Sequence, residues 1–131
     1  MIMDTVESLT IILPLPSGLL SPNHTIGSIG GRFAKAGAIK KYRRLAREAV
    51  EAERIETAPW RKVTVKARFC FKENRRRDPD NATGSLKAAY DGIVDSGLVE
   101  DDSYDFMTRL PPVFLLDHKC PRVELSIERI Q

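Results

Sequence analysis

The chain is poor in residues that form cross-links or bind soft metals. It has two cysteines and two histidines among 131 residues. Cys70 and Cys120 are too few and too far apart for a disulfide scaffold or a four-ligand zinc site, and the scarcity of histidine also argues against zinc. We therefore expect two reduced thiols in the protein core, as in a cytoplasmic protein.

The chain also lacks a long hydrophobic run. The apolar segment LTIILPLPSGLL, residues 9–20, is interrupted by Pro14 and Pro16, whereas a membrane-spanning helix needs about 20 consecutive apolar residues. This excludes a transmembrane helix there, disfavours a signal peptide and predicts no membrane partner. The chain is 42% hydrophobic and 30% charged, which is typical of a soluble globular protein, and its length predicts one domain over residues 1–131.

Acidic and basic residues are unevenly distributed along the chain. The net charge is +3, most basic residues lie between residues 32 and 77, and acidic residues gather from Asp78 to Asp105. This layout suits a polyanion that is held by one region and acted on beside an acidic centre. Charge alone, however, is more simply explained by a solvated surface.

Hydrophobic periodicity predicts the main elements. The predicted strands are residues 8–13 and 63–71, and the predicted amphipathic helices are residues 37–55 and 82–95. Asn81 is placed to cap the start of the second helix and Gly97 to end it.

The remaining segments complete the predicted fold. Residues 14–35 are rich in proline and glycine and predict a long loop, and residues 104–116 and 121–130 supply further strands. Pro111 and Pro112 limit the first of these strands to a sheet edge or split it. We therefore expect an α+β fold, in which two main helices pack on a small mixed β-sheet.

Two carboxylates flank a proline at the start of the second predicted helix. Pro79 favours an extended Asp78, and residues two apart in an extended segment face the same side, so Asp78 and Asp80 are expected to point into one space. A hard divalent cation such as Mg²⁺ relieves their repulsion. The ordinary alternative is that an aspartate at this place only caps the helix.

Further charged residues follow on and after the same predicted helix. Lys87 lies seven residues after Asp80, on the same helical stripe, and is spaced to pair with Asp91. Taken alone such a pair is an ordinary surface contact, whereas beside a metal and a phosphate the ammonium offsets charge on the leaving oxygen. Gly97 allows the chain to turn back so that Asp102 reaches Asp78.

Residues 75–102 carry RRRDPDN followed by LKAAYDGIVDSGLVEDD. This run is similar to the signature of the RusA family of Holliday-junction resolvases, and the order of the other predicted elements fits that family across most of the chain. The lysine stands three residues farther from the second aspartate than in the best-known member, which amounts to almost one helical turn and largely keeps its face.

The resemblance implies a set of site residues. Asp78, Asp80 and Asp102 look like the metal-binding catalytic aspartates, with Asp101 as the alternative to Asp102, and Lys87 looks like the essential lysine. The predicted DNA-binding residues are Arg75, Arg76, Arg77 and Asn81.

The resemblance also implies an activity and its partners. The family acts as a homodimer with Mg²⁺ or Mn²⁺ and nicks two strands of a four-way junction, in DNA recombination and repair. Two other functions stay open: a nuclease of the same fold that prefers flaps or other branched DNA, and a non-catalytic nucleic-acid-binding module.

Overall fold

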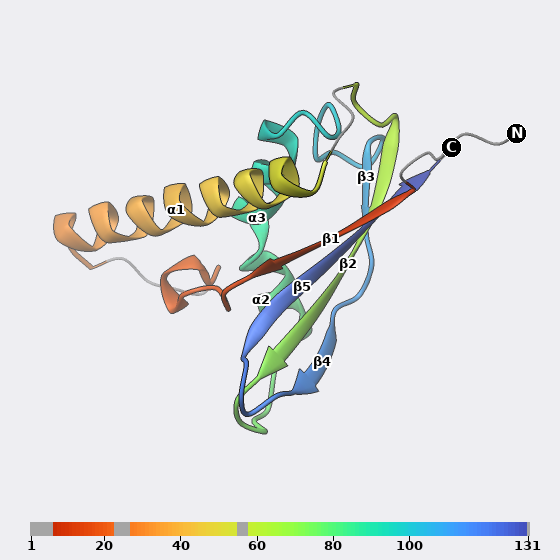
Figure 1. Cartoon of the computed structure of the whole chain (residues 1–131). Coiled ribbons are helices and arrows are strands. Elements are labelled where there is room, and N and C mark those ends of the chain that lie inside the picture. Colours follow the sequence, from red (N-terminus) through yellow and green to blue (C-terminus); the bar gives the residue numbers. More distant parts are fainter. Residues whose placement is uncertain (1–6, 23–26, 55–57, 131) are drawn as a thin grey trace, which may run out of the picture.

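A computed structural model describes residues 7–22, 27–54 and 58–130 (Figure 1). The elements in chain order are β1 (Ser8–Leu13), the 3-10 helix η1 (Gly18–Leu20), α1 (Ile29–Glu53), β2 (Lys62–Phe71), α2 (Pro79–Gly84), α3 (Lys87–Asp95), β3 (Met107–Arg109), β4 (Val113–Leu116) and β5 (Arg122–Ile130). They form a mixed sheet with helices on one face, which confirms the predicted α+β class.

The sheet is organised around β2. Its strand order is β1-β5-β2-β3, and β4 also pairs with β2. β5 lies antiparallel to both β1 and β2, whereas β3 and β4 lie parallel to β2, one after the other along the same edge. Pro111 and Pro112 fall between β3 and β4, so the predicted interruption of this edge strand is confirmed.

One face of the sheet and two helices enclose the core. The inward-facing residues of the three long strands are Leu9, Ile11, Leu13, Val63, Val65, Ala67, Phe69, Val123, Leu125 and Ile127, and all are buried. They alternate with exposed or half-buried residues because side chains along a strand point to opposite faces. Helix α1 contributes Tyr42, Ala46 and Val50 to this core. No helix in the described ranges combines the length and apolar character needed to span a membrane.

The two cysteines have different environments. Cys70 is buried near the end of β2, as predicted, whereas Cys120 is exposed before β5. The prediction that both are core thiols was therefore wrong for Cys120, which lies in the turn between β4 and β5, where no strand alternation directs it inward.

Helix α1 begins eight residues earlier than the predicted residue 37. The Ser28 hydroxyl accepts a hydrogen bond from the amide of Gly31 and caps the first turn. The predicted loop over residues 14–35 was therefore wrong over its last part, and η1 also forms within it. Residues 29–41 contain no fully buried side chain, so hydrophobic periodicity gave no signal for these turns.

Candidate functional site

Asp78 is the cap of a short helix that follows β2. Its backbone is extended, with φ −101° and ψ 114°, and its Oδ1 accepts hydrogen bonds from the amides of Asp80 at 3.0 Å and Asn81 at 3.5 Å. Pro79 suits the first helical position because its φ is preset and its missing N–H has no intrahelical partner there. The predicted cap at Asn81 was therefore wrong, since the helix begins at Pro79.

The extended conformation ends at Asp78, which changes the relation between the two carboxylates. Asp80 lies in the first turn of α2, so the prediction that it shares one side of an extended segment with Asp78 was wrong. Both residues are exposed. Within the ranges that the structure describes, the carboxylate of Asp80 has no hydrogen bond or ion pair, and that of Asp78 uses only Oδ1.

These two carboxylates fit the ligand chemistry of Mg²⁺. The ion takes hard oxygen ligands and is commonly held by one or two carboxylates together with substrate phosphates. Among residues 7–22, 27–54 and 58–130, no three His, Cys, Asp or Glu side chains are grouped so as to hold a metal. Asp78 and Asp80 therefore suit Mg²⁺ as a pair of ligands, and the phosphate of a substrate would supply further oxygens.

The second predicted helix, residues 82–95, is divided in two. Ser85 and Leu86 separate α2 from α3, and Leu86, with φ −94° and ψ 4°, leaves the helical region. The Ser85 hydroxyl donates to the carbonyl oxygen of Ala82 at 2.6 Å, and such back-bonding competes with helix continuation. Gly84 adds to the break because glycine is a poor helix former. Lys87 is consequently the first residue of a new helix rather than a residue in the middle of one.

Lys87 lies between two carboxylates. Its Nζ donates to Asp91 Oδ1 at 3.0 Å, which confirms the predicted pair along the helix, and it also donates to Asp102 Oδ2. Asp102 returns to this position because Gly97, with φ 85°, ends α3 and turns the chain, as predicted. The carboxylate that was expected to approach Asp78 thus contacts Lys87.

Arg109 completes this cluster and was missed by the sequence analysis. Its Nη2 donates to Asp102 Oδ2 at 3.1 Å and to the Asp102 carbonyl oxygen at 3.0 Å, and its guanidinium lies 4.5 Å from the centre of the Tyr90 ring. Arg109 ends β3, and only the pairing of β3 with β2 brings it to this place. No local motif marks it.

The charges of this cluster stabilise one another. The pKa of the Asp102 carboxyl is lowered, chiefly by the hydrogen bond from Lys87 and further by Arg109. The pKa of Lys87 is raised by its hydrogen bonds to Asp102 and Asp91. Burial raises the pKa of Tyr90 to about 12, so its hydroxyl stays protonated near neutral pH. Asp102 is half-buried whereas Asp101 is exposed, which makes Asp102 the member of the acidic pair that faces Lys87.

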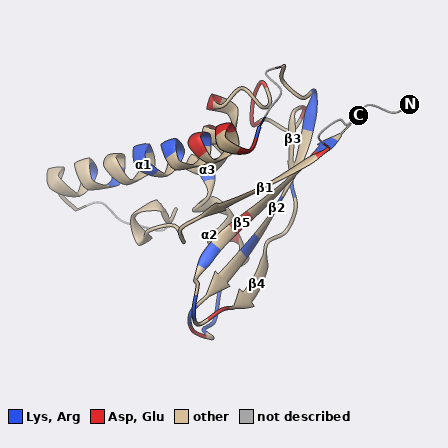
Figure 2. Ribbon diagram, viewed as in Figure 1, with Lys and Arg blue, Asp and Glu red and all other residues tan. Residues whose placement is uncertain are grey.

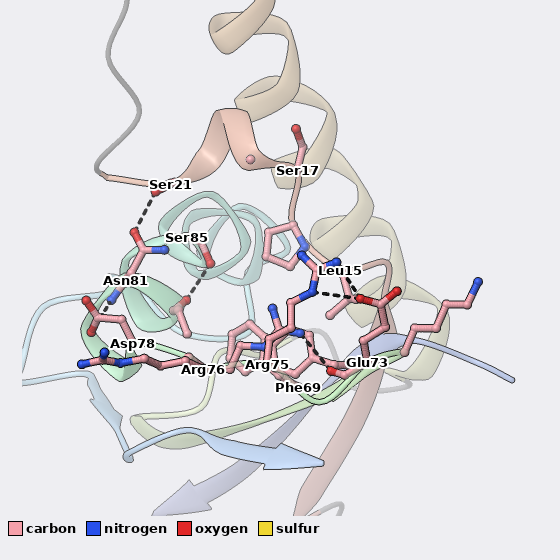
Figure 3. Close-up of a pocket in the computed structure, with 16 residues that line it drawn as sticks. Leu15, Ser17, Ser21, Phe69, Glu73, Arg75, Arg76, Asp78, Asn81 and Ser85 are labelled. Carbon is pink, nitrogen blue, oxygen red and sulfur yellow. Dashed lines mark hydrogen bonds and ion pairs between the residues drawn. The ribbon is translucent and has the colours of Figure 1, made fainter. Parts of the chain in front are cut away.

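Two clefts flank α2. The smaller one, about 390 Å³, is lined by Thr83, Gly84, Lys87, Tyr90, Asp102, Ser103 and Arg109. The larger one, about 570 Å³, lies between the segment around η1, the end of β2 and α2, and Asp78 and Asn81 line it (Figure 3). Asp78 and Asp102 therefore face different clefts, with α2 as the wall between them.

The three predicted DNA-binding arginines differ in their contacts. Arg75 donates to Glu73 Oε2 through Nε at 2.9 Å and Nη2 at 2.6 Å, so its charge is already paired (Figure 3). Arg77 donates to the Glu73 carbonyl oxygen at 3.1 Å and lies 3.6 Å from the centre of the Phe71 ring. Arg76 is exposed and has no hydrogen bond or ion pair within the described part of the chain. It is the arginine best placed to meet a phosphate.

Asn81 connects α2 to the segment around η1, which also lines the larger cleft. Its Oδ1 accepts a hydrogen bond from the Ser21 hydroxyl at 2.7 Å. This contact joins α2 to residues that lie sixty positions earlier, as Figure 3 shows.

Comparison with known proteins adds no relative to this description. No protein-family model matches the chain, and a search of curated proteins gives no match.

Proposed function

We propose that this protein is a metal-dependent, structure-selective endodeoxyribonuclease that resolves Holliday junctions by paired nicks. The observation that carries the proposal is the placement of Lys87 and Arg109 on one oxygen of Asp102, across α2 from Asp78 and Asp80. Cations and solvent-facing carboxylates on opposite sides of one short helix suit phosphodiester hydrolysis, in which negative charge must be bound and a nucleophilic water positioned.

Asp78 and Asp80 would hold Mg²⁺, or Mn²⁺ in its place, whereas Asp102 would act from the neighbouring cleft through Lys87 and Arg109. Lys87 and Arg109 both donate to Asp102 Oδ2. When bound, the ion would stabilise charge on the phosphate and lower the pKa of an attacking water.

Lys87 and Arg109 have roles of their own in this proposal. Asp102 orients both cations, so they require little reorganisation when charge develops on the leaving oxygen. The raised pKa of Lys87 keeps its ammonium protonated at neutral pH. Lys87 is therefore assigned to charge stabilisation rather than to proton abstraction.

DNA contacts surround these groups. Arg76 would meet the backbone directly, and phosphate contacts of this kind are sensitive to salt. Arg75, Arg77 and Asn81 would contribute near the larger cleft, where they are already positioned by Glu73, Phe71 and Ser21. Basic residues are also distributed along α1, whereas the acidic residues of this helix lie toward its end (Figure 2).

A homodimer would match the symmetry of the substrate. A four-way junction has approximate two-fold symmetry, and an isologous dimer presents two sites related in the same way. Each site would then cut one of two opposed strands.

One assay tests this function. Synthetic four-way junctions, flaps and linear duplexes are incubated with wild type and Asp80→Asn in Mg²⁺, Mn²⁺ or EDTA. We expect paired nicks in the junction with wild type and either metal, and none with Asp80→Asn or EDTA. Preferential cutting of flaps would identify a branched-DNA nuclease instead. Binding without cutting in either metal would favour a non-catalytic module in which Asp78 acts only as a helix cap.

A further inference from the structure

The larger cleft has an apolar wall that the binding of backbone phosphates does not require. Its volume of about 570 Å³ is within the range of small-molecule sites, roughly 300–1,000 Å³. Leu15, Pro16, Phe69, Phe71 and Ala82 line it together with the arginine run. We infer that this cleft receives an unstacked nucleobase of the DNA, next to the phosphate that is cut, an inference that rests on the proposed nuclease function.

The stacked pair of Phe71 and Arg77 offers the surface that a base requires. The guanidinium carbon of Arg77 lies 3.6 Å from the Phe71 ring centre, and both residues line the cleft. Phe71 is itself fixed by Phe69 and Phe114, each with its ring centre 5.8 Å away. Unstacked bases are held on aromatic rings and on arginine planes in this manner, largely without regard to sequence.

Polar groups at the cleft wall lack acceptors. Arg77 Nε is buried and has no hydrogen-bond partner among the described residues. Buried donors are normally paired, so an acceptor that enters beside Arg77 would remove an unfavourable feature. The Asn81 oxygen is occupied by Ser21, and its amide N–H groups have no partner within the described ranges. The Asn81 donors favour a base edge that presents acceptor atoms, whereas Arg77 Nε, which lies in the plane on which the base stacks, would donate to the backbone of the same nucleotide.

The position of the cleft links the base to the proposed cleavage. Arg77 and Asp78 are adjacent in the chain and line the same cleft. A base held there therefore belongs to a nucleotide beside the phosphate at Asp78 and Asp80. Extruding a base from intact duplex costs unstacking and unpairing energy, which is smaller at a branch point. Binding of a base in the cleft would therefore favour branched over linear DNA.

The test uses 2-aminopurine as a fluorescent base at successive positions around the branch of a four-way junction. Asp80→Asn serves as the background in EDTA, so that binding is observed without cleavage. We expect a change of emission at one or two positions beside the branch, and none in a linear duplex of the same sequence.

Substitution of Arg77 by lysine then tests the stack. Arg77→Lys keeps the charge but loses the plane, so we expect junction affinity to fall about tenfold with an unchanged salt dependence, and the emission change to disappear. Arg61→Lys, at an exposed arginine before β2, is the matched control and should change affinity less than threefold. Ala82→Leu narrows the cleft from another wall and should also remove the emission change, with thermal melting verifying that both variants fold.

Four outcomes would overturn the inference. If the junction is bound and cut but no position shows an emission change, the nuclease function stands and no base enters the cleft. Equal effects of Arg77→Lys and Arg61→Lys would place the base elsewhere, and so would an emission change that persists in Ala82→Leu. Failure to bind either DNA removes the inference together with the proposed function.

Discussion

The ammonium of Lys87 and the carboxylate of Asp102 are hydrogen-bonded although the residues are fifteen positions apart. Arg109 donates to the same carboxylate oxygen at 3.1 Å. The contact connects the first turn of α3 to the segment that follows the Gly97 turn. Asp102 is therefore the common partner of both cations.

Loss of the Lys87 ammonium should lower turnover more than binding. We expect Lys87→Met to reduce kcat about 100-fold, because the removal of one preorganised charge-stabilising donor typically costs 10²–10³. Junction affinity in EDTA should change little. Lys119→Met, at an exposed lysine before β5, is the matched control and should retain full activity. A Lys87→Met variant that cuts as fast as this control would remove Lys87 from the site.

Two substitutions at Asp78 separate its capping role from metal binding. Asp78→Ala removes the acceptor for the amides of Asp80 and Asn81 and should cost about 1 kcal/mol of unfolding free energy. Asp78→Asn keeps a good cap and should cost much less. In thermal melts, Mn²⁺ should raise the Tm of wild type more than that of either variant. An ion that binds the folded protein stabilises it, and both variants lose a carboxylate of the proposed metal site. Equal Mn²⁺ shifts in all three proteins would contradict metal binding at Asp78.

The arginines should differ in their contribution to salt-dependent binding. Arg76→Gln is expected to reduce the slope of log Kd against log salt by about one, as for the loss of one phosphate contact. Arg75→Gln should change it less, because Glu73 already pairs that charge. Junction binding titrations at several salt concentrations measure both slopes. A larger change for Arg75→Gln than for Arg76→Gln would contradict this order.

Gly92 is required by the packing of α1 against α3. A Cβ at Gly92 would lie 2.2 Å from the carbonyl oxygen of Arg43 and 2.8 Å from Ala46 Cβ. We expect Gly92→Ala to lower the unfolding free energy by about 1–3 kcal/mol in urea denaturation. Gly37→Ala is the control, because nothing lies within 4 Å of its added Cβ. There alanine should be neutral or stabilising by about 0.5–1 kcal/mol through its helix propensity.

The pairing of Asp102 should add stability only above acidic pH. Its folded pKa is lowered from the ordinary 3.8, so its contribution is present above that value and is lost as pH falls through the lowered pKa. The pKa of Lys87 is raised from 10.5, so the lysine contribution persists until more alkaline pH. The stability difference between wild type and Asp102→Asn should thus be constant from about pH 5 to 9 and shrink below about pH 4. Because Lys87 is exposed, we expect at most about 1 kcal/mol.

Local pattern was sufficient for much of the fold. Strand alternation predicted β1 and β2 to within one residue, since one face of each is buried. Gly97 was predicted to end a helix because its positive φ is readily adopted by glycine. The spacing of Lys87 and Asp91 predicted their ion pair for the same local reason, that residues four apart meet on a helix.

Other boundaries depended on side-chain contacts that periodicity does not report. The first turns of α1 bury nothing completely, and their start is set by the hydroxyl of Ser28. The break between α2 and α3 depends on the Ser85 hydroxyl and on Gly84. Competing hydrogen bonds of this kind shift helix ends without altering the spacing of apolar residues.

The sequence by itself determined the fold class and singled out the charged residues of the proposed site, because composition and short-range spacing act locally. Tertiary structure alone decided the partners of Asp102. The turn after α3 placed Asp102 on Lys87, and the pairing of β3 with β2 added Arg109. It also separated Arg75, Arg76 and Arg77, which are identical in the sequence, into a paired, an exposed and a stacked side chain. The contacts of Asp102 join separate elements of the chain, where only packing fixes which charges meet.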